Sequence, residues 1–163
     1  MARWVVLGSS SLAVTTATSL ADRDGEVLVV TDDADRAEAL AEAGIAVRVA
    51  DPTAPVALAD LSDVAVVAAF DADAAVNVAV ARRTRATYPR ARLVAYAGDE
   101  PGGDRERLDE LADRVIDRDR LTTDYLLERV GDESVQTRQL YRVLRAIDPL
   151  AVLDHDIPDP EAI

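Results

Sequence analysis

The strongest constraint on the fold is a regular alternation of short apolar runs with segments of helical spacing, which begins near the N-terminus. The apolar run at 3–7 leads into a turn at Gly8–Ser11 and then into a helical segment at 12–21. Further apolar runs lie at 26–31, 45–49, 63–69, 91–96 and 114–117, with helical segments between and after them at 34–43, 55–61, 71–88, 105–112 and 121–130. Apolar strands separated by helices indicate a parallel sheet covered on both faces. We therefore predict an α/β fold, with a doubly wound parallel sheet of about six strands, helices on both faces and a C-terminal helix.

Length and composition fit one domain with an aliphatic core. The chain has 163 residues, of which 49% are hydrophobic and only 4% aromatic, so Ala, Val, Leu and Ile must fill the interior. There is no cysteine, which excludes disulfides and cysteine-ligated metals. No apolar run approaches the roughly 18 residues of a membrane span, and the start lacks the apolar stretch of a signal peptide. We therefore expect a cytoplasmic protein with no membrane insertion.

The charge balance is strongly acidic. Asp and Glu number 31 against 18 basic residues, all of them Arg, and the net charge is −13. An acidic surface without lysine suits a halophile, because concentrated salt screens the self-repulsion. The alternative is an acidic protein from an arginine-biased, GC-rich genome. In either case the charge argues against direct nucleic-acid binding through a broad basic surface.

The turn after the first apolar run has the layout of a phosphate-binding turn in a Rossmann-like fold. Such a turn reads G-x-G-x-x-G, and here it reads Gly8-Ser9-Ser10-Ser11-Leu12-Ala13. Gly8 suits the tight turn, and Ala13 is small enough for helix–strand packing. Ser10 replaces the middle glycine, where its side chain either crowds a phosphate or donates to it. Asp32 follows Gly8 by 24 residues, the place of an acid that binds ribose hydroxyls and disfavours a 2′-phosphate. The alternative is that Asp32 and Asp33 only start the next helix.

Across 3–130 the chain resembles the TrkA-N domain, also called the RCK N-terminal or KTN domain, of potassium-uptake regulators. The matching stretches are the strand and turn at 5–13, Val-Val-Thr-Asp at 29–32, and the segments 44–53, 63–77 and 112–117. The resemblance implies a domain that binds NAD(H) or an adenine nucleotide and often forms a homodimer. Position by position, it implies that the nucleotide faces Gly8, Ser9, Ser10, Ser11, Asp32 and Asp33. It also implies that Asp51 lies near the adenine and that Asn77 braces the neighbouring loops or, alternatively, merely caps one.

The end of the chain has a different character. An amphipathic helix is predicted at 132–147, within a linker at 131–148. The segment 149–163 resembles the start of a DHH-family phosphoesterase domain, and the residues that carry the resemblance are His155, Pro158, Asp159, Glu161 and the final Ala-Ile. The alternative is a solvated acidic tail. The resemblance implies that His155, Asp159 and Glu161 would be part of a Mn or Mg site in a longer parent protein. His155 is the sole histidine, so we expect no complete metal site and no enzyme activity in this chain.

Four functions remain open at this point. The first is a regulatory nucleotide-binding domain, 1–130, that serves potassium transport, with a membrane transporter as a partner, or controls a fused enzyme. The second is a non-catalytic N-terminal fragment of a DHH-family phosphoesterase or exonuclease acting on nucleotides. The third is a dehydrogenase, which is disfavoured because it would need a substrate domain for which the chain has no room. The last is a degenerate module that only dimerises.

Overall fold

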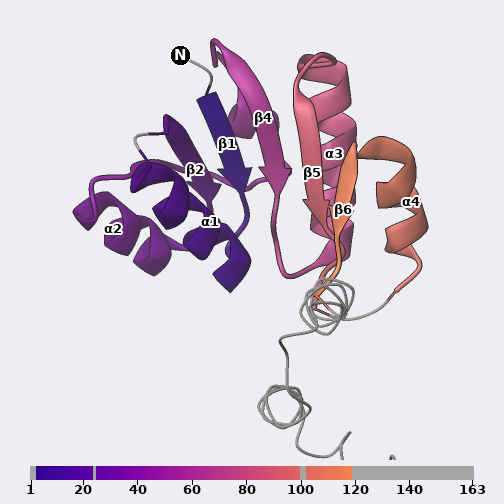
Figure 1. The fold of residues 1–163 in the computed structure, drawn as a ribbon, viewed down its shortest axis with the longest axis horizontal. Helices are drawn as coiled ribbons and strands as arrows, with labels where there is room; N and C mark the ends of the chain where they lie inside the picture. Colours follow the sequence, from indigo (N-terminus) through magenta and orange to yellow (C-terminus); the bar gives the residue numbers. More distant parts are fainter. Residues whose placement is uncertain (1–2, 24, 100–101, 119–163) are drawn as a thin grey trace, which may run out of the picture. The chain divides into compact units, whose positions relative to one another are not determined.

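Six strands alternate with helices in the part of the chain that the computed structural model describes, which is residues 3–23, 25–99 and 102–118 (Figure 1). The elements in chain order are β1 (Arg3–Leu7), α1 (Ser11–Ala21), β2 (Val27–Thr31), α2 (Ala34–Glu42), β3 (Ala46–Val49), the short 3₁₀ helix η1 (Pro55–Leu58), β4 (Val64–Ala69), α3 (Ala74–Thr87), β5 (Arg92–Tyr96), α4 (Asp104–Leu111) and β6 (Arg114–Ile116).

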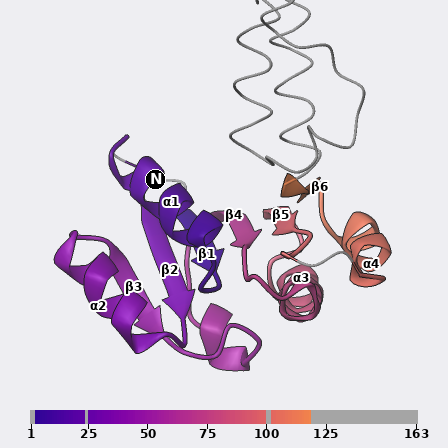
Figure 2. The same ribbon diagram turned by 90° about the horizontal axis from the view of Figure 1, so that it is seen from below.

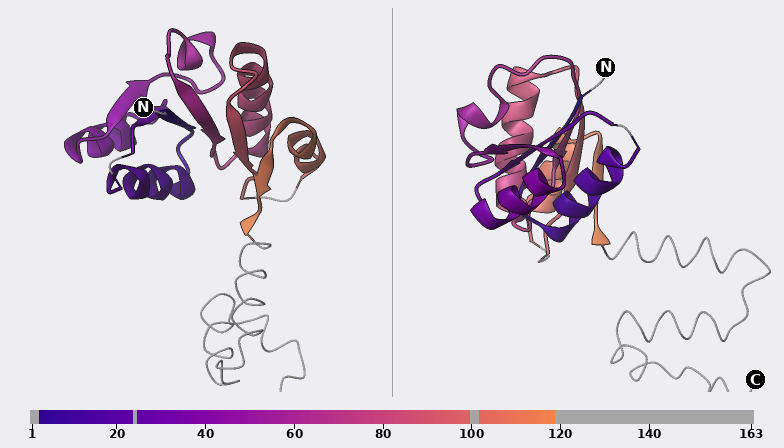
Figure 3. Two further views of the ribbon diagram at one scale, coloured as in Figure 1. Left: turned by 45° about the horizontal axis from the view of Figure 1, so that its top comes forward. Right: turned by 90° about the vertical axis from the view of Figure 1, so that its left-hand side faces the viewer.

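The strands form one all-parallel sheet in the order β3-β2-β1-β4-β5-β6. The chain moves outward from β1 to β3, returns to β4 on the other side of β1, and moves outward again. α1 and α2 pack on one face of the sheet, while α3, α4 and η1 pack on the other (Figures 2 and 3). The predicted Rossmann-like, doubly wound α/β fold is confirmed. In this topology the loops after β1 and β4 diverge to opposite faces, which opens the usual ligand position at the carboxyl ends of the strands.

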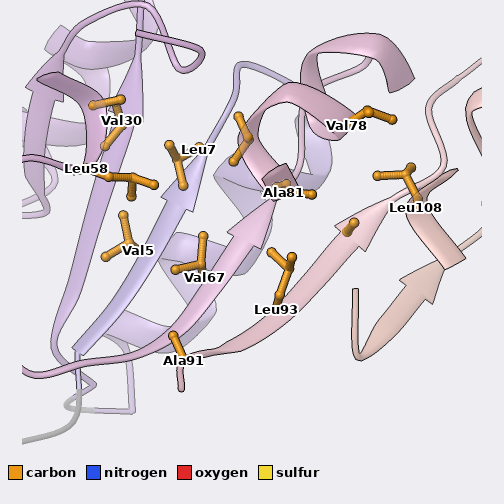
Figure 4. Packing of buried hydrophobic residues seen from close by; sticks show 14 residues of the cluster. Val5, Leu7, Val30, Leu58, Val67, Val78, Ala81, Ala91, Leu93 and Leu108 are labelled. Carbon is orange, nitrogen blue, oxygen red and sulfur yellow. The ribbon is translucent and has the colours of Figure 1, made fainter. Parts of the chain in front are cut away.

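The core consists of two aliphatic layers, one on each face of the sheet. Val5 and Leu7 point to the face covered by α3, and Val6 points to the face covered by α1. All three are fully buried, as expected for a central parallel strand. Figure 4 shows the larger layer, in which Leu93 of β5 lies beside Val67 of β4, and Leu108 of α4 lies at the end of the layer on the side of Val78.

The elements begin and end close to the predicted positions, with two exceptions. The sequence pattern predicts a helix at 71–88, but α3 begins only at Ala74. The carboxylate of Asp73 accepts a hydrogen bond from the N–H of Ala75 at 2.8 Å and caps the helix, so the true start signal is Asp73. The predicted short helix at 55–61 is likewise only the four-residue η1.

The predicted helices at 121–130 and 132–147 and the segment 149–163 lie outside the described residues. Within the described residues, no helix combines the length and the apolar character needed to cross a membrane.

Candidate functional site

The turn after β1 requires glycine at its first position. Gly8 has φ +124°, a backbone conformation that other residues rarely adopt. A Cβ atom on Gly8 would lie 2.5 Å from the backbone nitrogen of Asp71 and 2.7 Å from the carbonyl carbon of Phe70. The backbone of the turn therefore rests directly on the segment that follows β4.

Ser10 turns its side chain into the protein. Its hydroxyl donates to the carbonyl oxygen of Phe70 and accepts from the N–H of Ala13 at 3.1 Å, which makes it the N-cap of α1. The residue is only 7% exposed. The hydroxyl therefore neither projects into the space over the turn nor remains free to donate to a phosphate. Ser10 thus occupies the position of the usual middle glycine, caps α1, and links the turn to the segment that follows β4.

The start of α1 offers unpaired donors. In the described part of the chain, the backbone N–H groups of Ser10, Ser11 and Leu12 have no hydrogen-bond partner. The first turn of this 11-residue helix contains no acidic residue. Free N–H groups and the positive end of the helix dipole together favour an anion. Ser9 and Ser11 flank Ser10 at the turn, and Ser11 is exposed.

The two acids after β2 have different environments. Asp33 is the N-cap of α2: its carboxylate accepts from the N–H of Arg36 at 3.0 Å. Asp32 is exposed, and no described residue forms a hydrogen bond or ion pair with its carboxylate. Because Leu7 pairs with Val30 in the sheet, Asp32 follows β2 at the same edge where Gly8 follows β1. Asp32 is thus the acid that is free to contact a ribose.

Asp51 lies further out, after the edge strand β3. Its carboxylate accepts from the Thr53 N–H at 2.8 Å and from the Thr53 hydroxyl at 2.7 Å. These hydrogen bonds, the hydroxyl first, hold the pKa of Asp51 below its usual value. Arg83 of α3 donates to the carbonyl oxygen of Thr53 at 3.1 Å and attaches the loop to the helix. Asp51 is exposed at the β3 side of the site.

Asn77 lies beneath the loops with no exposed surface. Its amide nitrogen donates to the carbonyl oxygens of Asp71 at 2.8 Å and of Tyr96 at 2.9 Å. Its amide oxygen accepts from the N–H of Asp71 at 2.8 Å. The side chain therefore joins the loop after β4 to the end of β5.

Asp71 is the site residue that the sequence reasoning did not single out. Its carboxylate accepts from the N–H of Ser9 at 3.2 Å and from the N–H of Asp73 at 3.0 Å. The Ser9 hydroxyl lies 3.5 Å from the same carboxylate. The only signal in the sequence was an acidic pair two residues apart directly after an apolar strand. Its contact with the first turn depends on the pairing of β1 with β4.

The end of β5 carries a buried tyrosine. The hydroxyl of Tyr96 donates to the Asp99 carboxylate at 2.6 Å. Burial, together with this hydrogen bond, raises the pKa of Tyr96 to about 12. The N–H of Asp99 in turn donates to the carbonyl oxygen of Ala72 at 3.0 Å, so the loops after β4 and β5 form one connected unit.

The described site thus combines unpaired backbone donors at Ser10–Leu12 with the free carboxylate of Asp32. Among the residues that the structure describes, no group of three or more His, Asp or Glu side chains is arranged to hold a metal ion. His155, Asp159 and Glu161 lie outside those residues.

Comparisons with known proteins identify relatives of this chain by family and by fold. The family model for the TrkA-N domain matches residues 4–120. No curated protein matches the chain. The NAD(P)-binding domain of an exopolyphosphatase-related protein from Archaeoglobus fulgidus is similar, with a TM-score of 0.69, 19% identity, and coverage of 80% of this chain and 98% of that one.

Two further solved structures are similar. The TrkA-N domain of the inner membrane protein ybaL from Escherichia coli has a TM-score of 0.69 and 17% identity, over 77% of this chain and 94% of that one. The GsuK channel bound to NAD has a TM-score of 0.63 and 23% identity, over 77% of this chain and 23% of that one. This chain therefore matches about a quarter of the channel's length.

Proposed function

Because the chain belongs to the TrkA-N domain family, we propose that it is a regulatory module that binds NAD(H) or an adenine nucleotide and transmits the binding event to a partner. The observation that carries the proposal is the set of unpaired N–H groups at Ser10–Leu12 beside the free carboxylate of Asp32. The GsuK channel has been solved with NAD, at 23% identity to this chain, and with ADP, at 20% identity, which supports both ligand classes.

The proposed binding mode follows from the positions of these groups. The phosphates lie over the N-terminus of α1, where the free N–H groups and the helix dipole stabilise negative charge. The ribose hydroxyls donate to Asp32, and the adenine extends toward Asp51. A 2′-phosphate would lie against the Asp32 carboxylate, so NAD is favoured over NADP. Asp33 and Asn77 shape the site through the backbone groups that they hold.

The module transmits the signal rather than catalysing a reaction. Its proposed partner is a membrane transporter or channel for potassium, or an enzyme fused to it. It acts as a homodimer, as the family resemblance implies. Sedimentation of the purified chain with and without ligand tests the dimer, and a monomer under both conditions would contradict it.

Titration calorimetry and thermal unfolding in concentrated KCl test the nucleotide-binding proposal. NAD, NADH, ADP, ATP and AMP are each added at millimolar concentration. A ligand at 100 times its Kd should stabilise the fold by about 2.7 kcal/mol. Absence of both heat and stabilisation with all five compounds would refute the proposal.

Two variants test the binding mode. Asp32→Asn should weaken NAD binding and reduce the discrimination against NADP, because the carboxylate accepts from the ribose and repels the 2′-phosphate. Glu38→Gln is the matched control, since Glu38 is an exposed acid on the adjacent helix α2. Equal effects of the two substitutions would show that only the overall charge matters.

The name of one relative favours a second candidate. A similar domain belongs to an exopolyphosphatase-related protein, and the segment 149–163 resembles the start of a DHH-family phosphoesterase domain. In this alternative the module controls a metal-dependent phosphoesterase encoded downstream. Further metal-ligating acids and an Asp-His-His sequence after Ile163 in the reading frame would support it. A stop codon directly after Ile163 would reject it.

A further inference from the structure

We propose that Asp71 determines which nucleotides the site accepts. Its fixed carboxylate favours a dinucleotide, whose phosphates are all diesters, over a mononucleotide that ends in a phosphate monoester, such as ADP. This inference rests on the proposed nucleotide-binding function and names the ligand class of that site.

The negative charge is held against the turn. The Asp71 carboxylate accepts from the Ser9 N–H at 3.2 Å with one oxygen and from the Asp73 N–H at 3.0 Å with the other. The Asp71 N–H and carbonyl are both bonded to the buried side chain of Asn77. Gly8 packs against the same backbone. The carboxylate therefore cannot move away without loss of both hydrogen bonds.

The direction of the bound ligand brings its terminal phosphate toward this charge. Asp32 follows β2, the turn follows β1, and Asp71 follows β4, and these strands are neighbours in the order β2-β1-β4. A ribose at Asp32 places the adenosine over β2. The phosphates then run across the turn toward β4, and the phosphate furthest from the adenosine meets Asp71.

The chemistry of that last phosphate decides the preference. In a dinucleotide it is a diester with one charge. In ADP it is a monoester that carries nearly two charges at neutral pH, because its second pKa is about 6. One added charge about 6 Å from a carboxylate weakens binding about threefold in bulk water and about tenfold at half that dielectric constant.

The test is calorimetric titration of the full chain with NAD and with ADP. The Asp71→Asn variant should lower the Kd for both ligands, and the Kd for ADP about three- to tenfold more than the Kd for NAD, so the ratio of the two constants changes by that factor. Asp71→Ser also removes the charge and should change the ratio in the same direction. It serves as the second variant if Asp71→Asn folds poorly. Asp71→Glu keeps the charge and should leave the ratio near that of the natural chain.

Asp73→Asn is the matched control. It removes an equal charge two residues away, and asparagine caps α3 as well as aspartate does. An unchanged ratio in both neutral Asp71 variants, or an equal change in Asp73→Asn, would overturn the inference while the proposed function stands. If neither NAD nor ADP binds to any of the proteins, the proposed function fails and this inference fails with it.

Discussion

Replacement of Gly8 with alanine should destabilise the domain strongly, because two independent costs act at this position. The first is conformational: φ +124° is a backbone region that L side chains rarely adopt. The second is steric: the new Cβ atom would lie 2.5 Å from the nitrogen and 2.7 Å from the Cα atom of Asp71. Both are backbone atoms of the segment that follows β4, so they cannot move away by a side-chain rotation.

The size of the effect follows from these two costs. A strained backbone conformation costs about 1–3 kcal/mol, and a forced core contact costs about 1–3 kcal/mol more. The expected loss is therefore about 2–6 kcal/mol out of a total stability of roughly 5–15 kcal/mol. At about 4 °C per kcal/mol, the melting temperature should fall by about 8–24 °C.

Urea unfolding of the natural chain and two glycine variants measures this effect. Gly44→Ala is the matched control, because Gly44 has φ +80° but no atom within 4 Å of an added Cβ. Gly44→Ala should therefore show only the conformational cost, about 1–2 kcal/mol. If Gly8→Ala loses no more stability than Gly44→Ala, the close contact with Asp71 does not exist as described and the reasoning fails.

Three further substitutions have defined outcomes. Ser10→Ala should cost about 2–4 kcal/mol in urea unfolding, because α1 loses its cap and a buried carbonyl loses its donor; a loss below about 0.5 kcal/mol would contradict these contacts. The Tyr96 contribution is complete below about pH 10, the unfolded pKa, and is lost as pH rises through its folded pKa of about 12. The stability deficit of Tyr96→Phe should therefore vanish at high pH, and a constant deficit would refute this. A hydrogen bond from the Leu93 N–H lowers the pKa of Asp113, so its contribution is present above about pH 4 and is lost as pH falls through the lower folded pKa. Acid unfolding of Asp113→Ala and the natural chain should converge below that point, and parallel curves would argue against the linkage.

The layers of the fold could be predicted because their signals are local. Central strands buried on both faces are continuous apolar runs, as at 64–69, and the turns between elements carry Gly or Asp. The start of α3 was misplaced because Asp71 and Asp73 both resemble helix caps. Only the three-dimensional structure shows that Asp73 caps the helix while Asp71 reaches back to Ser9.

The candidate site could be predicted only in part, for a related reason. Gly8 and Asp32 follow a spacing that the sequence displays directly. The inward orientation of Ser10 depends on its hydrogen bond to Phe70, which is 60 residues away in the sequence. No sequence pattern near the turn indicates this contact. The division of roles between Asp32 and Asp33 depends on which of two adjacent carboxylates reaches the first turn of α2.

The hydrogen bond from Ser10 to Phe70 also has a consequence for the order of events during synthesis. The two residues are separated by 60 positions, which take roughly 3–12 s to translate at about 5–20 residues per second. Until β4 has emerged and paired with β1, the first turn lacks the contacts that orient it. A growing chain that has exposed only β1 to β3 therefore lacks the complete turn of the proposed nucleotide site. Measurement of nucleotide affinity in ribosome-bound chains of increasing length would show at which chain length β4 pairs with β1.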